Sequence, residues 1–417
     1  MARESGPQIF GILASGYLMS YGLRAINATI APELVAEFDL SNAALGSLTS
    51  AYFVGFSLMQ IPVGIWLDRF GPRRVDATLI GVAALACCLI AMSNHYVALW
   101  LARALLGAGF AAGLMASFAM FRLWFAPSLQ QRLAAWVMMV GSIGVLTATV
   151  PARAAIPVLG WRGLFIAGAV VLSIVAVAMW FGLPSTREPK RADRQSFLRS
   201  LLGYREVLRS PWFWRMAVMA SVVQGGFISL HTLWIGPWFT RVLGLSAEQA
   251  ASGLFAFNLC LLLAYLVGGW LAPRFNTSER TTVRIAATAV SLTVAMQFVI
   301  VLSPTGAGVA GWLLFAVLST VFTPLQARVA LSFPQAYSGR ALTAFNLMVF
   351  SSVIGMQTLL GVLIDGLITA GWSQAQAFRI GIAALAGCQS LVWLLFVAWP
   401  RIFAGMPAKA NASRTDP

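Results

Sequence analysis

The stretch GIWLDRFGPRR, residues 64 to 74, carries three arginines and one aspartate in its last seven positions and lies between two strongly apolar runs. Charge is rare elsewhere in the chain: 10% of the 417 residues are charged, 59% are hydrophobic and the mean hydropathy is +0.81. An ordinary soluble domain has about 25% charged residues. The composition therefore indicates a membrane protein, and the charged stretch indicates a short loop between two spans.

Outward from this stretch, hydropathy divides the chain into apolar runs of about 20 residues, the length that crosses a hydrocarbon core of about 30 Å as a helix. The runs are continuous rather than alternating. This favours helices over a barrel, because a helix satisfies its own backbone hydrogen bonds in lipid. The twelve expected spans are residues 9–30, 43–67, 75–93, 98–121, 133–152, 162–183, 212–238, 248–272, 283–303, 309–327, 341–365 and 377–399.

Basic residues set the orientation of these spans. With the N-terminus in the cytoplasm, all but six of the 28 lysines and arginines fall on the cytoplasmic side, as the positive-inside rule requires. We therefore expect a multi-pass protein of the plasma (inner) membrane with both termini in the cytoplasm. The same placement explains the net charge of +15 and argues against a nucleic-acid partner. The first span lacks a convincing cleavage site, so we expect it to be retained.

The longest polar interval separates six spans from six, and the two halves resemble each other. APELVAEFDLS (31 to 41) matches GPWFTRVLGLS (236 to 246) at Pro, Leu and Ser, and IWLDRF (65 to 70) matches GWLAPRF (269 to 275). Parallel six-helix repeats recur among transporters. We predict an all-α membrane protein with twelve transmembrane helices in two six-helix bundles. The expected units are an N-terminal bundle at 1–183, a cytoplasmic linker at 184–211, a C-terminal bundle at 212–400 and a cytoplasmic tail at 401–417.

These motifs carry a resemblance to a known family. GIWLDRFGPRR fits the GxxxDRxGxRR signature of the major facilitator superfamily at every fixed position, and ARALLGAG (102 to 109) fits that family's RxxxGxG pattern. The chain resembles this superfamily over essentially its whole length through span number, central linker and repeat. The resemblance implies two bundles that rock about a site near the middle of the membrane, with spans 1, 4, 7 and 10 lining the cavity.

The signature also has a physical interpretation. Asp68 can meet the N-terminus of an opposing helix or an arginine of the other bundle and so hold one conformation closed, while the glycines allow close approach and a tight turn. We assign gating or conformational roles to Gly64, Asp68, Arg69, Gly71, Arg73, Arg74 and, from the second pattern, Arg103. Alternatively, the loop arginines only obey the positive-inside rule. The second copy, WLAPRF, lacks the aspartate, which argues against a symmetric second latch.

Arg24 is the charge inside a span that best fits a binding site, because an embedded ionisable group is costly. Tyr21 and Asn27 lie about one turn away on the same side of the predicted helix, and a guanidinium offers a planar fork to carboxylate, phosphate or nitrate. YGLRAINATIAP resembles span 1 of organophosphate and organic-anion members of the superfamily. There, an arginine eight residues before a proline binds the anion, which implies this role for Arg24 alone. The alternative is an arginine that extends to the membrane surface or pairs with Glu33 or Glu37.

His231 lies in the seventh span, with Gln224 seven residues earlier on the same face. By the repeat, His231 should approach the level of Arg24 across the cavity, where a protonated imidazole completes an anion site or carries a coupled proton. The alternative is a neutral histidine bonded within its bundle. Polar residues of later spans would face the cavity or bridge helices. The candidate binding set is Arg24, His231, Tyr21, Asn27, Gln224, Asn258 and Asn346.

No aspartate or glutamate falls in the middle of a predicted span. The embedded carboxylate typical of proton-coupled sugar and drug carriers is thus missing, which favours an anionic or zwitterionic solute. Two histidines and four cysteines, all four inside predicted spans, provide no metal cluster or catalytic triad, so we expect no enzyme and no cofactor.

We therefore expect a secondary active transporter, driven by proton symport or exchange, that moves a small anionic or zwitterionic metabolite by alternating access. Its partners would be this solute, protons and the lipid bilayer, and the chain would act as a monomer. Two alternatives stay open: an exporter of drugs or metabolites, and a transporter-like sensor or assembly factor that binds without turnover.

Overall fold

The computed structural model describes residues 6–184, 204–271, 279–303, 305, 307–320, 333 and 335–402, although some side chains there, that of Asp68 among them, lie outside the description. Within these ranges the regular structure is entirely helical. The N-terminal half consists of α1 (Gly6–Ala25), α2 (Asn27–Phe38), α3 (Asn42–Phe70), α4 (Pro72–Met92), α5 (Tyr96–Gly109), α6 (Gly113–Trp124), α7 (Pro127–Thr147) and α8 (Val150–Gly182). The C-terminal half consists of α10 (Pro211–Ser229), η1 (Leu230–Trp234), α11 (Ile235–Arg241), α12 (Ala247–Leu271), α13 (Glu279–Leu302), α14 (Gly308–Ser319), α16 (Gln335–Thr369) and α17 (Gln374–Ile402).

The helices follow the apolar runs of the sequence. In the described residues, eight helices are long and apolar enough to cross a membrane, and the bent pair of α1 and α2 gives up to nine. Three shorter apolar helices, in α7, α13 and α14, occupy the remaining expected spans. The prediction of an all-α membrane fold is confirmed. One expected loop, residues 153–161, is helical instead, because α8 starts at Val150 and bends at Gly160, where φ is 66°.

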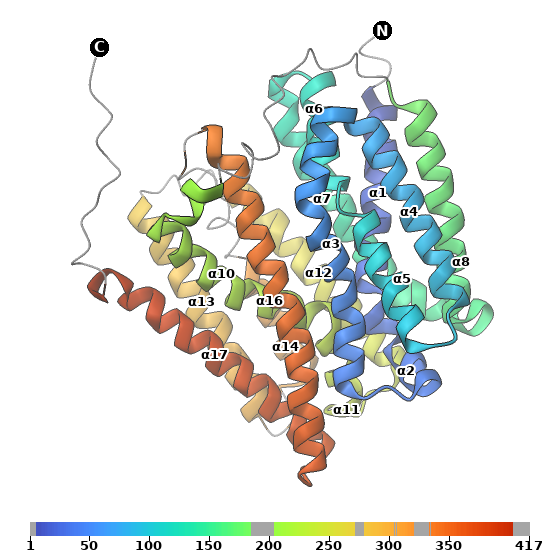
Figure 1. Cartoon of the computed structure of the whole chain (residues 1–417). Helices are drawn as coiled ribbons and strands as arrows, with labels where there is room; N and C mark the ends of the chain where they lie inside the picture. Colours follow the sequence, from blue (N-terminus) through green and yellow to red (C-terminus); the bar gives the residue numbers. More distant parts are fainter. Residues whose placement is uncertain are drawn as a thin grey trace.

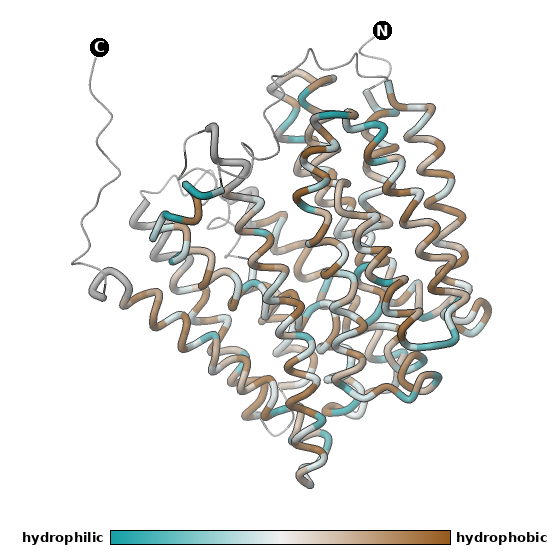
Figure 2. The backbone as a smooth tube through the Cα atoms, viewed as in Figure 1, coloured by the Kyte–Doolittle hydropathy of each residue, from teal (hydrophilic) through white to brown (hydrophobic). Residues whose placement is uncertain are grey.

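The outer face of α8 shows how these helices meet lipid. Ile166, Val170, Ile174, Val177 and Phe181 are exposed and recur every three or four residues, so they form one apolar stripe along the helix. Figure 2 shows the same apolar colouring along this helix. Large apolar side chains are exposed in this pattern where the surrounding solvent is hydrocarbon. The chain is a multi-pass membrane protein.

Glycines of the two sequence motifs shape the N-terminal half. Gly71 ends α3 at a φ of 78°, a conformation that disfavours other residues, and Pro72 then starts α4 in its first turn. Close packing follows along α3: a Cβ on Gly107 would lie 1.8 Å from the carbonyl oxygen of Tyr52. Small residues thus let α3 and α5 approach at backbone distance, as membrane helices commonly do.

The helices of the first and seventh expected spans are both interrupted within their length. A 45° bend separates α1 from α2, and Pro32 inside α2 has no N–H to donate to the carbonyl of Ala28. Gly236 packs against that carbonyl, since a Cβ there would lie 2.7 Å from the Ala28 oxygen. In the seventh span the π-helical turn η1 lies between α10 and α11 and interrupts the α-helical geometry. These interruptions bring α2 and α11 together.

The two halves touch along α3 and α16 and between α2 and α11 (Figure 1). We call the end of the molecule formed by α2, α11 and the last turns of α16 the closed end. The opposite end, which carries residues 64–74, is the signature end. The ribbons of the two halves diverge toward the signature end in Figure 1.

Candidate functional site

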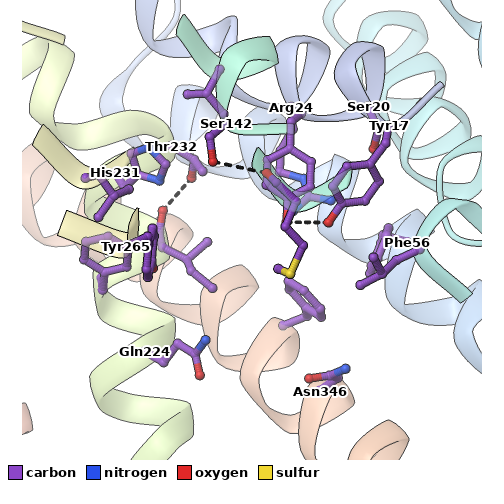
Figure 3. A pocket seen from close by; sticks show the side chains of 18 of the residues that line it. Tyr17, Ser20, Arg24, Phe56, Ser142, Gln224, His231, Thr232, Tyr265 and Asn346 are labelled. Carbon is purple, nitrogen blue, oxygen red and sulfur yellow. Dashed lines mark hydrogen bonds between the residues drawn. The ribbon is translucent and has the colours of Figure 1, made fainter. Parts of the chain in front are cut away.

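A cavity of about 1350 Å³ lies between the two halves. Its walls come from α1, α3, α6 and α7 on one side and from α10, η1, α12, α13, α14, α16 and α17 on the other. The lining reaches Gly64 near the end of α3 and Arg122 near the end of α6, so the cavity extends toward the signature end. Figure 3 shows Arg24 and Phe56 on one side and His231 and Gln224 on the other.

Arg24 occupies the N-terminal wall of the cavity within a cage of aromatic rings. Its guanidinium carbon lies 4.5 Å from the ring centroid of Tyr21, 5.3 Å from that of Tyr52 and 5.4 Å from that of Phe56. Its Nε donates to the Tyr52 hydroxyl at 3.4 Å, and the Tyr17 hydroxyl donates to that of Tyr21 at 3.0 Å. The rings hold the guanidinium by cation–π attraction and leave most of its N–H groups for a ligand.

The two acids that could neutralise Arg24 are occupied elsewhere. Glu33 pairs with Arg153, and Glu37 pairs with Arg162. Glu37 also accepts a hydrogen bond from the Trp161 indole N–H at 2.7 Å. Within the described part of the chain Arg24 has no ion-pair partner, and the alternative that it pairs with Glu33 or Glu37 is wrong.

His231 occupies the opposite wall, in the π-helical turn η1, where its ring stacks on those of Phe227 and Phe257. Its Nε2 lies 2.7 Å from Oδ1 of Asn258. The Asn258 Nδ2 donates to the carbonyl of Leu254 at 2.8 Å, so the amide oxygen faces the imidazole. Nε2 of His231 therefore carries a proton and donates it. The remaining nitrogen, Nδ1, is the one whose protonation can change.

Amides complete the C-terminal wall. Gln297 Nε2 donates to Gln389 Oε1 at 2.6 Å, and Gln389 Nε2 lies 3.3 Å from the carbonyl oxygen of Val222. Gln224 and Asn346 also line the cavity, as predicted. Sequence reasoning missed Gln297 and Gln389. Their only signal is that each is an isolated glutamine in an apolar helix.

Charge is unevenly distributed over the cavity. The described lining residues include two arginines, Arg24 and Arg122, and one histidine, but no aspartate or glutamate. A cavity with cations and no carboxylate attracts anions and repels cations, most strongly where its walls exclude water.

A sequence model described as the Major Facilitator Superfamily matches residues 13–356, which is well over half of the chain. The chain belongs to the Major Facilitator Superfamily. The resemblance drawn from the two motifs is thereby confirmed.

Relatives within the Major Facilitator Superfamily carry transporter names. A probable nitrate/nitrite antiporter of Thermus thermophilus is 32% identical over 257 residues, which are 58% of this chain and 55% of that protein. The hexuronate transporter of Escherichia coli K12 is 24% identical over 283 residues, 64% of this chain and 65% of that protein. A probable sulfoacetate transporter of Cupriavidus necator is 26% identical over 356 residues, 80% of each chain. The chain thus spans between about half and two thirds of the first two relatives.

Solved structures share the fold. An inward-facing, occupied bacterial homologue of the human lysosomal transporter Spinster superposes with a TM-score of 0.75 at 16% identity, covering 95% of this chain and 97% of that one. A D-xylose–proton symporter superposes with a TM-score of 0.73 at 13% identity, covering 93% and 96%. At these identities the likeness concerns the Major Facilitator Superfamily fold alone.

Of the described residues of the signature stretch, Gly64, Ile65 and Leu67 line the cavity and the three arginines do not. Arg73 Nη1 donates to the carbonyl of Leu183 at 3.0 Å, so it ties the loop to the end of α8. Arg69 lies over the ring of Phe70, and both Arg69 and Arg74 are exposed. Asp68 lies in the last turn of α3, and its side chain lies outside the described residues.

Two further predicted residues lie behind the cavity wall. Asn27 is buried and donates to the Thr49 hydroxyl at 3.0 Å, so it faces α3. Arg103 is 1% exposed and points Nη1 at the carbonyl of Leu23, 3.5 Å away, next to the bend between α1 and α2. Nε and Nη2 of Arg103 have no hydrogen-bond partner in the part of the chain that the structure describes. Both residues support the helix that carries Arg24.

Proposed function

We propose that this protein is a secondary active transporter of a small anionic or zwitterionic metabolite, working by alternating access. The observation that carries this proposal is the cavity itself: among the described residues Arg24 has no carboxylate partner, and the described lining includes no acid. A guanidinium without a counter-ion inside a membrane span is costly unless a ligand completes its hydrogen bonds. The anionic substrates named for the three relatives support the same class.

In this proposal the anionic group of the substrate binds the guanidinium of Arg24, assisted by the Tyr21 hydroxyl. The uncharged part of the substrate faces the opposite wall, where Gln224, Asn258 and Asn346 offer hydrogen-bonding groups. His231 takes part through Nδ1, as an acceptor when neutral and as a second cationic donor when protonated. Asn27 acts by positioning, because it faces α3 rather than the cavity.

Coupling and topology belong to the same proposal. A proton on His231 adds positive charge to the cavity, so protonation and anion binding favour each other and the two ligands travel together.

By the positive-inside rule, the signature end and both termini lie on the cytoplasmic side of the plasma (inner) membrane, and the cavity would then open to the cytoplasm. We propose that the monomer is the working unit, with bundles at 1–183 and 212–400 joined by the linker 184–211 and followed by the tail 401–417. Most of the linker and tail lies outside the described residues.

The test is uptake by purified protein in proteoliposomes. The probes are radiolabelled nitrate, sulfoacetate and a hexuronate, with an uncharged hexose and an organic cation of similar size as controls. We expect saturable uptake of at least one anion, faster when the external pH is lower than the internal pH. Uptake of only the hexose or the cation would contradict the proposal.

A further inference from the structure

At the closed end, the two halves are joined through the first turn of α3. Asp365, near the end of α16, accepts two backbone hydrogen bonds from this turn. Its Oδ1 accepts from the Asn42 N–H at 3.1 Å and its Oδ2 from the Ala43 N–H at 2.7 Å. Oδ1 also accepts from Nδ2 of the Asn42 side chain at 2.7 Å. These residues are 322 and 323 positions apart in the sequence.

This contact completes the cap of α3. The first N–H groups of a helix have no partner within it, and they carry partial positive charge. Ser41, the N-cap of α3, satisfies only the N–H of Ala44, at 3.2 Å. The N–H groups of Asn42 and Ala43 are satisfied by the carboxylate from the other half. These two N–H groups of α3 therefore keep their hydrogen-bond partner only while the two halves stay in contact at this end.

Asn42 is held from two sides by the C-terminal half. While its Nδ2 donates to Asp365, its Oδ1 accepts a hydrogen bond from Nη1 of Arg241 at the end of α11. The amide of Asn42 thus binds a carboxylate through its NH2 group and a guanidinium through its oxygen, which fixes the orientation of the amide. We call this cluster of Asp365, Asn42, Ala43 and Arg241 the Asp365 latch.

Backbone packing below the latch leaves no room for adjustment. A Cβ on Gly361 would lie 2.3 Å from the Asn42 carbonyl oxygen, and one on Gly46 would lie 2.3 Å from the Gln357 carbonyl oxygen. Helices α3 and α16 therefore meet at backbone distance. Because packed interfaces of this kind hold discrete arrangements rather than deforming continuously, the latch is either made or broken.

A hydrogen-bonded chain links the latch region to the cavity. Ser50 Oγ of α3 donates across the interface to Oε1 of Gln357 at 3.2 Å, and Gln357 Nε2 donates to the Thr232 hydroxyl at 2.8 Å. Thr232 lines the cavity and follows His231 in η1. Movement of η1 on ligand binding would reach the α3–α16 interface through two side chains.

We infer that Asp365 is a latch residue at this end of the transport pathway: it caps α3 in the closed conformation and releases it when the pathway opens there. The ion pair of Arg153 and Glu248 also joins the two halves at this end. The helix pair α3 and α16 is antiparallel, so Asp68 stands in the last turn of α3 at the opposite, signature end. The pair thus carries an aspartate near each of its C-terminal ends. The inference rests on alternating access but on no particular substrate.

Spin labels on a cysteine-free chain test the latch without any substrate. The labels are placed at Asn94, after α4, and at Gln374, at the start of α17, which are exposed and lie on opposite halves at the closed end. Pulsed electron paramagnetic resonance in lipid nanodiscs gives the distance distribution between them. The native thiols to be replaced are Cys87, Cys88, Cys260 and Cys388.

We expect the reference protein to populate mainly the short distance, and Asp365→Asn to raise the ratio of long to short distances at least about tenfold, because charge-assisted caps are lost. The matched control is Asp39→Asn, which removes an exposed carboxylate at the same end. An unchanged distribution in Asp365→Asn, or an equal shift in Asp39→Asn, would overturn the inference.

Size-exclusion chromatography shows whether Asp365→Asn is folded. If it is not, a second variant keeps the test decisive. Asn42→Ala removes the amide between Asp365 and Arg241 but leaves both backbone caps, so we expect a shift of about threefold in the same direction. No shift would overturn the latch. Because the measurement needs no substrate, failure of the proposed anion transport would leave its result intact.

Discussion

The two walls of the cavity come from halves that resemble each other in sequence, yet they carry different chemistry. The N-terminal wall holds the guanidinium of Arg24 among tyrosine rings, and no described residue forms an ion pair with it. The C-terminal wall holds an imidazole and amides, at His231, Gln297 and Gln389. A duplicated fold thus provides two similar frames, and single substitutions divide the work between them. One wall carries the fixed charge, and the other carries neutral groups and a titratable one.

Local backbone structure explains part of this difference. Counted back from the proline that each half has near the closed end, Arg24 corresponds to Ser229 and Ile26 corresponds to His231. In the first half Arg24 lines the cavity and Ile26 is buried; in the second half Ser229 is buried and His231 lines the cavity. The hydrogen bonds of the π-helical turn η1 span five residues instead of the four of an α-helix, so the turn directs a different face inward.

The largest expected effect comes from removing the fixed charge. Arg24→Ala should lower anion uptake into proteoliposomes about 100-fold or more, because a desolvated charge pair with the substrate is lost. Arg24→Lys keeps the charge without the planar fork and should lose about tenfold. Arg132→Ala, which removes an exposed arginine outside the cavity, is the matched control. Uptake by Arg24→Ala equal to that of the control would remove Arg24 from the site.

A smaller, pH-dependent effect comes from the other wall. His231→Gln should abolish the increase in anion uptake that we expect as pH falls through the range of about 8 to 5. Protonated His231 presents a second N–H and a positive charge, whereas the neutral amide of glutamine does not change its charge with pH. Among the described lining residues, His231 is the one histidine, and the other basic side chains are those of Arg24 and Arg122. His95→Gln, at the other histidine, is the control. A pH profile that persists in His231→Gln assigns the titration to another group.

The sequence predicted this contrast only in part. Hydropathy and the repeat located the spans, and Arg24 and His231 do line one cavity. Asn27 illustrates the limit: a straight helix places it beside Arg24, but the 45° bend makes it the first residue of α2, where it faces Thr49. Helical spacing cannot be carried across a bend whose angle depends on packing.

Contacts between the halves were beyond sequence reasoning for a different reason. WLAPRF, the second copy of the motif at the end of α3, lacks the aspartate. This absence does not exclude a latch whose carboxylate comes from another helix. Asp365 comes from α16, which packs on α3 across the interface, and one chain contains no signal that pairs residues so far apart. Buried amide pairs such as Gln297 and Gln389 were missed likewise, because polarity alone does not reveal a partner.

The smallest expected effect tests whether the N-terminal wall depends on how its charge is held. Tyr52→Phe removes only the hydroxyl that accepts from Arg24 Nε at 3.4 Å and keeps the ring beneath the guanidinium. One long hydrogen bond contributes little beside the remaining cation–π contacts, so uptake should fall about two- to fivefold, mainly through a higher KM. Tyr96→Phe is the control, because its hydroxyl donates to the Ala44 carbonyl at 3.1 Å, away from the cavity. A loss as large as that of Arg24→Ala would mean that orientation, rather than charge, sets the difference between the two walls.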